Sequence, residues 1–318
     1  MIIKPGYRKL FSITLKMLVF GATLWYLYEK VLINQAFSGF RPFVKTLGFQ
    51  SVLIIILVVF LMFINWGIET QKWRMLIGKF EKISFWRAYR AVWSGITINN
   101  WIPNRMGEFA GRILYISAEN QPKSVIATFI SSFAQMTSTI IIGLPALIIH
   151  FHKTSQPLWS ILSLLIIALF ILIYFNNVFF HKTIKYVRIP LWISRHTEIL
   201  ETYKKEDLAI ILLMALLRFS VYIFQYYLLF QVFNIILPVR VVLPSLASIF
   251  FIQTFIPAIT LTEIGIRGAV ILYVFNPVQN EVLPLLSAAW SLWLINIIIP
   301  SVFGAFFILF KKRNKTAL

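Results

Sequence analysis

Cysteine is absent from this chain of 318 residues, and acidic residues are scarce. Without thiols the chain can form neither disulfide bonds nor thiolate metal sites, and a cysteine nucleophile is excluded. The four histidines stand at the ends of apolar segments or in loops, without the spacing of zinc-binding motifs. A nucleotide-binding loop, a Ser/His/Asp set and a carboxylate cluster are also missing from the sequence. We therefore expect no metal, no cofactor and no catalytic centre.

Charged residues make up only 13% of the chain, whereas hydrophobic residues make up 59%. Soluble domains typically contain about 25% charged and about 45–50% apolar residues, so a soluble globule is excluded. The apolar residues fall in runs of roughly 18 to 29, long enough to cross a hydrocarbon core of about 30 Å as helices. The chain is therefore predicted to be an all-α polytopic membrane protein.

Basic residues dominate the remaining charge, with thirty Lys and Arg against eleven Asp and Glu and a net charge of +19. In a membrane protein such an excess is typical of cytoplasmic loops that lie against anionic lipid, and we expect no nucleic-acid partner. Lys4, Arg8 and Lys9 precede the first apolar run, which lacks a small-residue cleavage site after it. We expect that run to be retained as a first span in the cell (inner or plasma) membrane.

Eight apolar segments follow one another along the chain. Six are uninterrupted and are predicted as full spans: 11–28, 51–68, 124–151, 158–179, 208–232 and 282–310. The other two, 85–118 and 241–275, each run into a proline and a polar loop before a second short helix-like stretch. This pattern predicts two broken helix pairs.

The two broken segments carry the same motif. In both, Ile-Pro is followed by a glutamate and then by an arginine four residues later, namely Glu108 with Arg112 and Glu263 with Arg267. The offset between the two motifs is nearly half the chain. The same offset also superimposes the other predicted spans of the first half on predicted spans of the second half. The chain is therefore predicted to contain two copies of one unit of three spans and one broken pair, residues 1–155 and 156–318.

The distribution of basic residues indicates how the two copies are oriented. If each broken pair enters and leaves the membrane on one side, most basic residues, Lys72 among them, fall on cytoplasmic stretches. If the pairs crossed the membrane, the basic cluster between Lys182 and Lys205 would lie outside. An inverted repeat with re-entrant pairs and both termini in the cytoplasm is therefore predicted. This architecture is typical of transporters, whose substrate lies where the helix breaks meet.

Charged residues at membrane depth are costly, at least about 2.5 kcal/mol each on insertion scales, and they mark functional sites. In this chain the basic residues at that depth outnumber the acidic ones, which predicts an anionic ligand or a water-filled cavity. The basic residues are Lys16, Arg105, Arg112, Arg218 and Arg267; the acids are Glu108 and Glu263, with Glu69 placed at the end of a span.

Two interpretations of the Glu/Arg motifs remain open. A glutamate four residues before an arginine is a favourable helical pair, so each motif could simply neutralise its own short helix. Alternatively, the charges contact substrate. Arg105 and Arg218 have no obvious partner in sequence and favour a binding role, although a glutamate from another helix could pair with Arg218.

Polar residues recur on one face of the span 124–151. Hydrogen bonding between helices is the favoured explanation for this stripe, and cavity lining is the second. The stripe comprises Thr128, Ser131, Ser132, Gln135 and Thr139. The predicted substrate-binding set is Asn100, Arg105, Glu108, Arg112, Gln135, Arg218, Glu263 and Arg267. Gly107 and Gly111 indicate close packing across the first motif.

The motifs together resemble the transmembrane-region family of lysylphosphatidylglycerol synthases, the flippase-like membrane half of multiple-peptide-resistance proteins. The residues that carry the resemblance are Trp73, Arg74, Asn100, Pro103, Arg105, Gly107, Glu108 and Arg112, then Pro257, Gly265, Arg267 and Ala269. Family members usually place a glutamate after the second arginine, where this chain has Gly268. Only Lys311 to Leu318 follows the last predicted span, so the resemblance implies lipid translocation without the soluble aminoacyl-transferring domain.

The leading hypothesis is therefore a flippase or transporter-like protein that moves an anionic phospholipid or another phosphate-bearing lipid between leaflets. One alternative is a membrane-embedded transferase that uses a polyprenyl-phosphate lipid, with Glu108 or Glu263 as base. The other is a non-transporting membrane subunit whose basic cytoplasmic faces bind a soluble enzyme partner.

Overall fold

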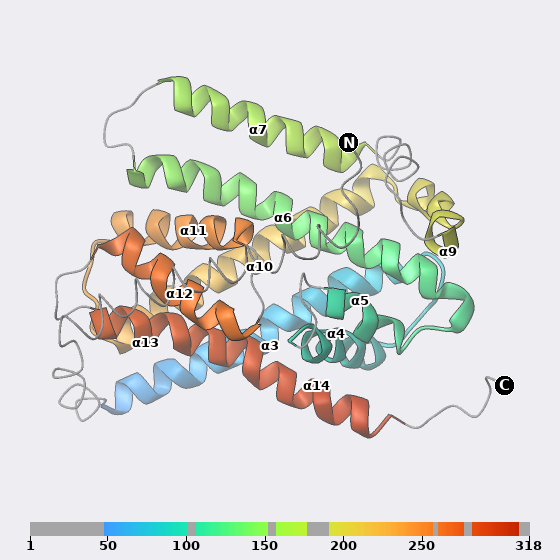
Figure 1. Ribbon diagram of the computed structural model, residues 1–318, viewed down its shortest axis with the longest axis horizontal. Helices are drawn as coiled ribbons and strands as arrows, with labels where there is room; N and C mark the ends of the chain where they lie inside the picture. Colours follow the sequence, from blue (N-terminus) through green and yellow to red (C-terminus); the bar gives the residue numbers. More distant parts are fainter. Residues whose placement is uncertain are drawn as a thin grey trace, which may run out of the picture.

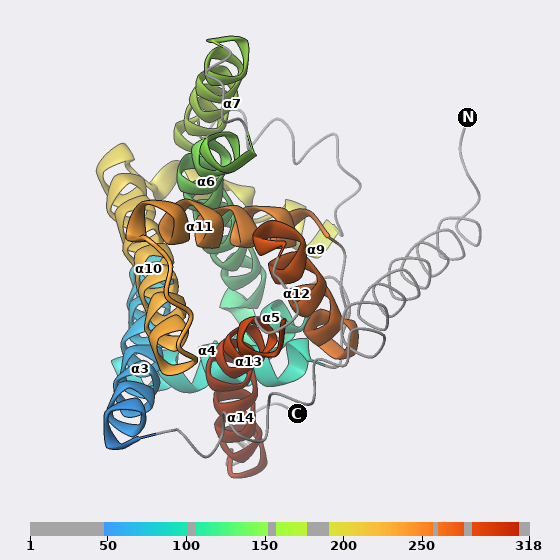
Figure 2. The same cartoon turned by 90° about the vertical axis from the view of Figure 1, so that its left-hand side faces the viewer.

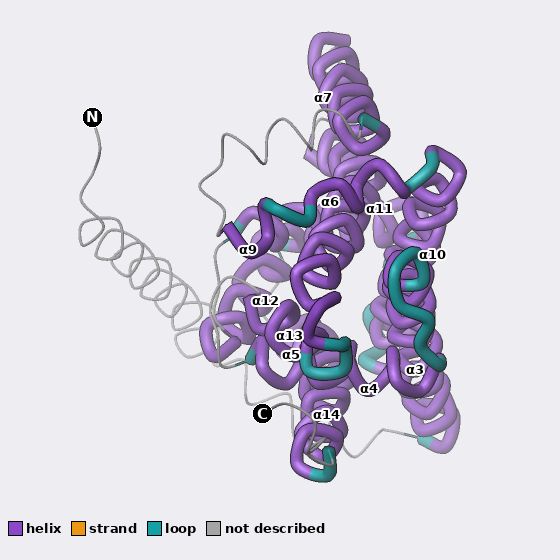
Figure 3. Tube along the Cα trace, turned by 90° about the vertical axis from the view of Figure 1, so that its right-hand side faces the viewer, coloured by secondary structure: helices purple, strands orange, loops and turns teal. Residues whose placement is uncertain are grey.

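The computed structural model describes residues 48–100, 106–151, 157–176, 191–256, 260–276 and 282–311, and these form an assembly of helices (Figure 1). Within these ranges the chain contains helices and loops but no strand (Figure 3). The prediction of an all-α chain is confirmed to this extent. The predicted span 11–28, Lys16 and Arg105 lie outside the described residues.

Five helical stretches in the described ranges are long and apolar enough to cross a membrane, which confirms five of the predicted spans as helices. They are α3 (Phe49–Ile77), α6 (Gln121–Phe151) with the short turn before it, α7 (Pro157–Phe175), α10 (Lys205–Val232), and the continuous stretch from α13 (Val282–Trp293) to α14 (Ile299–Leu309). Many of their apolar side chains face outward, such as Phe60 at 59% and Leu213 at 65% exposed. An apolar exterior of this kind is suited to lipid.

Helix α3 extends further than the predicted span 51–68, because the charged residues after Ile68 stay inside the helix. Glu69 is 4% exposed and Lys72 is fully buried. The placement of Lys72 on a cytoplasmic stretch and of Glu69 at a span end stays a prediction, but both side chains are buried inside the protein and not in contact with solvent. The two side chains form an ion pair, Lys72 Nζ to Glu69 Oε2 at 2.7 Å, and this neutralisation lets both enter the interior.

A π-helical turn (Leu294–Ile298) joins α13 to α14. Pro300 follows this turn, where it lacks an N–H and its ring would clash with the carbonyl four residues earlier, that of Asn296. The wider turn accommodates the proline without breaking the helix.

The first broken segment folds into a hairpin of α4 (Phe85–Asn99) and α5 (Met106–Ile113). Its two ends meet: the carboxylate of Glu81, before α4, accepts hydrogen bonds from Ser117 N and Oγ, after α5, at 3.1 and 2.7 Å. Partial burial alone would raise the pKa of Glu81, but these hydrogen bonds and the nearby Arg87 charge hold its pKa below its ordinary value. The hairpin therefore begins and ends at one end of the fold.

The second broken segment forms α11 (Val239–Phe255) and α12 (Thr260–Phe275). Both helices contact His150 at the end of α6. His150 Nε2 donates to the Val274 carbonyl at 3.0 Å, and Nδ1 lies 3.0 Å from Ser245 Oγ. The start of α11 and the end of α12 therefore meet at the end of α6 that is remote from the first hairpin (Figure 1).

Helix α10 packs along α3 and α6, α11 packs on α6, and α14 packs on α4. Viewed from the end, α7 stands outermost, beside α6 (Figure 2). Glycine allows close approach at three helix contacts: α5 on α4, α14 on α4, and α6 on α11. A Cβ on Gly111 would overlap the backbone of Gly95, one on Gly304 would overlap Trp93, and one on Gly143 would press on Phe251. The predicted close packing across the first motif is present.

Candidate functional site

A cavity of about 530 Å³ lies between the two hairpins and the long helices α3, α6 and α10. Six of the eight predicted substrate-binding residues line it: Asn100, Glu108, Gln135, Arg218, Glu263 and Arg267. The other polar residues of its wall are Asn99, Ser132, Thr139, Tyr222, Gln253, Thr254 and Asn296. An interior cavity with this many polar groups in an otherwise apolar protein is the best candidate for a binding site.

A buried ion cluster lies behind one wall of the cavity, centred on Glu69. Its Oε1 accepts from Arg112 Nη2 at 2.9 Å and Ser131 Oγ at 3.1 Å. Its Oε2 contacts Lys72 Nζ at 2.7 Å and Arg218 Nη1 at 3.1 Å. A single buried carboxylate therefore faces three cations. Cations therefore outnumber acids around Glu69, although Lys16 and Arg105, two of the cations behind the predicted positive interior, lie outside the described residues.

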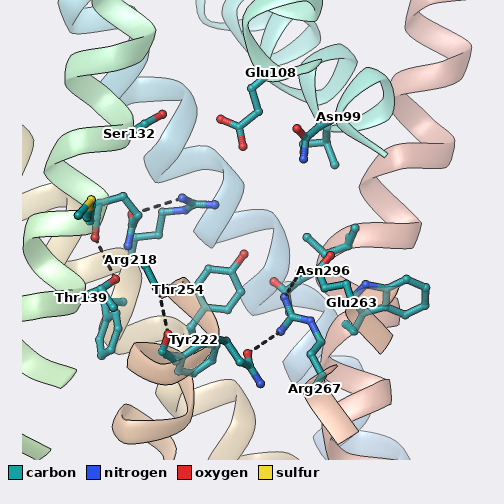
Figure 4. A pocket seen from close by; sticks show the side chains of 18 of the residues that line it. Asn99, Glu108, Ser132, Thr139, Arg218, Tyr222, Thr254, Glu263, Arg267 and Asn296 are labelled. Carbon is teal, nitrogen blue, oxygen red and sulfur yellow. Dashed lines mark hydrogen bonds and ion pairs between the residues drawn. The ribbon is translucent and has the colours of Figure 1, made fainter. Parts of the chain in front are cut away.

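Arg112 belongs to this cluster and does not line the cavity. The predicted pairing with Glu108 exists at 3.6 Å, but Arg112 is closer to Glu69, at 2.9 Å. Its side chain is only 2% exposed, and its Nε and Nη1 have no hydrogen-bond partner within the described ranges. Arg112 is thus a buried structural charge in this structure. Glu108, at 23% exposure, is left facing the cavity with Asn99 beside it (Figure 4).

Arg218 is the member of the cluster that reaches the cavity. Arg218 pairs with a glutamate from another helix, Glu69 of α3, which is the possibility that the sequence analysis left open. Its guanidinium also donates hydrogen bonds to Asn65 Oδ1 and Gln135 Oε1, and its Cζ lies 4.5 Å from the centre of the Trp66 ring. This stacking over an aromatic face is a favourable cation–π contact. Arg218 is therefore held in place on several sides while it faces the cavity.

Arg267 and Glu263 form the second charged group of the wall, on α12 (Figure 4). Arg267 Nη2 contacts Glu263 Oε1 at 2.6 Å, and Nη1 donates to Gln253 Oε1 at 3.4 Å. Nε of Arg267 is buried and has no hydrogen-bond partner among the described residues. The predicted local Glu/Arg pair is therefore formed in the second motif, and the same residues line the cavity. The two interpretations of the motif are compatible here.

The polar stripe of α6 divides between the two roles that the sequence suggested. Thr128 accepts a hydrogen bond from Trp73 Nε1 at 3.0 Å, and Ser131 binds Glu69, so these residues connect helices. Ser132, Gln135 and Thr139 line the cavity.

The predicted binding set did not include four residues of α3 that hold the cluster: Asn65, Trp66, Glu69 and Lys72. A signal for three of them was present. Asn65, Glu69 and Lys72 are spaced four and three residues apart and so share one helix face, next to the apolar span. Had the span been extended through Lys72, this polar face would have been visible.

Comparison with known families gives one match. The family described as lysylphosphatidylglycerol synthase TM region matches residues 13–304 of the chain. No curated protein matches the chain. The match includes every described residue of the cavity wall.

Proposed function

Because the chain belongs to the family of lysylphosphatidylglycerol synthase TM regions, a multi-pass membrane family with a lipid-related function, we propose that it is a flippase or related transporter. Its substrate is an anionic or phosphate-bearing lipid, whose headgroup passes through the cavity while its acyl chains stay in the bilayer. The protein resides in the cell membrane.

The observation that carries this proposal is the pair of arginines on the cavity wall. Arg218 and Arg267 come from different helices, and both face a cavity inside a protein with an apolar exterior. Glu69 compensates Lys72 and Arg112 only in part, so the surroundings of Arg218 keep an excess of positive charge. An anionic headgroup would neutralise this excess, and charge-assisted hydrogen bonds from arginine suit phosphate oxygens.

The positions of the two hairpins support the proposal of an inverted repeat with transport through this cavity. Each hairpin begins and ends at a single end of the fold, and the two hairpins lie at opposite ends of α6, near Asn120 and His150. Helices α4 and α11 have 15 and 17 residues, lengths of about 22 and 26 Å that fall short of a complete crossing. We infer that the hairpins re-enter the membrane from opposite sides, with both termini in the cytoplasm.

Single cysteines in this cysteine-free chain test the topology. Lys82 and Glu119 flank the first hairpin. Arg240 lies in the first turn of the second hairpin and Asn276 follows its end, and all four residues are exposed. In intact cells an impermeant thiol reagent is expected to label cysteines at Arg240 and Asn276, and to label those at Lys82 and Glu119 only after permeabilisation. Labelling at Arg240 without labelling at Asn276 would contradict the re-entrant arrangement.

Reconstitution in liposomes tests transport. The purified protein is expected to accelerate the flipping of a fluorescent phosphatidylglycerol, measured by quenching with a membrane-impermeant reductant. The double variant Glu263→Gln/Arg267→Gln, which leaves no unpaired carboxylate, should slow flipping by about tenfold or more, the order expected for a lost charge-assisted hydrogen bond. The control, Arg240→Gln, removes an exposed arginine from the same hairpin and should leave the rate unchanged.

The purified protein also distinguishes transport from the two alternative functions. Flipping no faster than in empty liposomes would refute the transport proposal. A transferase would instead consume polyprenyl phosphate in the presence of a donor. A docking subunit would co-purify with a stoichiometric soluble enzyme and leave flipping at the background rate.

A further inference from the structure

Asn65 on α3 is fully buried and does not line the cavity, yet it is joined to Arg218 twice. Its Oδ1 accepts from Arg218 Nε at 2.8 Å, and its Nδ2 donates to the backbone carbonyl of Arg218 at 3.1 Å. Both hydrogen bonds found for this side chain within the described ranges go to the same residue. Asn65 therefore fixes the side chain of Arg218 relative to its own backbone.

The remaining contacts of Arg218 leave one nitrogen unused. Nη1 is engaged by Glu69 Oε2 at 3.1 Å and by Gln135 Oε1 at 3.3 Å, and the Trp66 ring covers one face of the guanidinium. Nη2 makes no hydrogen bond to any described residue. It also does not belong to the unpartnered side-chain atoms that are fully buried. Since a guanidinium has five N–H donors, the two on Nη2 have no partner among the described residues, and Arg218 itself lines the cavity.

We propose that Asn65 is a positioning residue: by holding Nε, it keeps Nη2 of Arg218 directed into the cavity, where it donates to an oxygen of the anionic headgroup. This inference rests on the proposed function and adds a residue and an atom to it. An arginine whose rotamer is already fixed loses less conformational freedom on binding, so the affinity gained from the fixed geometry is expected to be measurable.

Asn65 suits a test because it is neutral. The replacement Asn65→Leu removes both hydrogen bonds but leaves every charge of the Glu69 cluster in place. A matched control is available on the same helix pair: Gln225 of α10 is also fully buried, and its Nε2 donates to the Val58 carbonyl of α3 at 2.8 Å. Gln225→Leu therefore removes a bond between α3 and α10 without touching Arg218.

The measurement is the affinity of the detergent-purified full chain for a short-chain phosphatidylglycerol, obtained by calorimetry, with a short-chain phosphatidylcholine as the zwitterionic comparison. Arg218→Met is expected to show the largest loss of phosphatidylglycerol affinity, about tenfold or more. Asn65→Leu is expected to weaken phosphatidylglycerol binding by about threefold to tenfold, and Gln225→Leu by less than about twofold. Phosphatidylcholine affinity should not respond to Asn65→Leu. In the Arg218→Met background, Asn65→Leu should not lower the affinity further, because the arginine that Asn65 positions is no longer present.

Several outcomes overturn the inference. One is an equal loss with Gln225→Leu, which would assign Asn65 a purely structural role. Others are an unchanged affinity in Asn65→Leu, a loss that persists in the Arg218→Met background, and an absence of phosphatidylglycerol binding by the unsubstituted chain. If Asn65→Leu does not fold, Asn65→Ser carries the same expectations. Binding that follows the expected pattern without any flipping in liposomes would refute the proposed function alone.

Discussion

Replacing Glu69 by glutamine is expected to destabilise the protein by about 3–5 kcal/mol, the cost of removing one partner from a buried ion pair. The carboxylate contacts Lys72, Arg112 and Arg218, so its loss leaves Lys72 and Arg218 without a counter-charge and Arg112 with only the partly exposed Glu108 at 3.6 Å. Thermal unfolding of the detergent-purified protein, followed by size-exclusion chromatography, measures the effect. Glu119→Gln removes an exposed carboxylate and serves as the control.

A second substitution tests whether charge is the cause. Lys72 is fully buried and its nearest contact is Glu69, at 2.7 Å. Adding Lys72→Met to Glu69→Gln removes one of the uncompensated cations and should recover part of the lost stability. Equal melting of Glu69→Gln and the unsubstituted chain would show that the cluster does not stabilise the fold. No recovery in the double variant would show that the cause is geometry and not charge.

Replacing Gly111 by valine is expected to cost about 3 kcal/mol or more, at the upper end of the range for overpacking. Gly111 faces Gly95, and even a Cβ would overlap the Gly95 backbone, so α4 and α5 would have to separate. The thermal assay described for Glu69 also measures this effect. Gly67→Val is the matched control, because nothing lies within 4 Å of a Cβ built at that helical glycine. Similar melting of the two variants would contradict the close contact between α4 and α5.

Separation of α4 from α5 should also affect the cavity. Asn99 ends α4, Glu108 lies in α5, and both side chains line the wall. Any fraction of Gly111→Val that remains folded is therefore expected to flip phosphatidylglycerol more slowly than Gly67→Val.

Local patterns in the sequence were sufficient to predict five long apolar helices and six polar or charged residues of the cavity wall. Apolar runs identified the spans, and the repeated motif placed Glu108, Glu263 and Arg267 at one site, because a motif in each break can be compared directly with its copy. Gln135 was found through the spacing of polar residues on one helix face. All four line the cavity.

Pairing between distant helices could not be predicted in the same way. Arg218 and Glu69 are separated by 149 residues, and no local pattern indicates which carboxylate an arginine meets across a bundle. For this reason Arg112 was paired with its helical neighbour Glu108, although Glu69 is closer in the fold. The charges of Glu69 and Lys72 also ended the predicted span early, because hydropathy counts each as unfavourable and does not register that they neutralise one another.

The ion pair between Glu69 and Arg218 also bears on how α10 enters the membrane. Helix α3 is synthesised long before α10, and it carries its carboxylate already neutralised by Lys72 three residues later. Arg218 arrives 149 residues afterwards, in a helix that would enter lipid at a cost of about 2.5–3.5 kcal/mol for an unpaired arginine. We therefore expect α10 to insert more readily when α3 is still next to the insertion site, where Glu69 can pair with the incoming arginine.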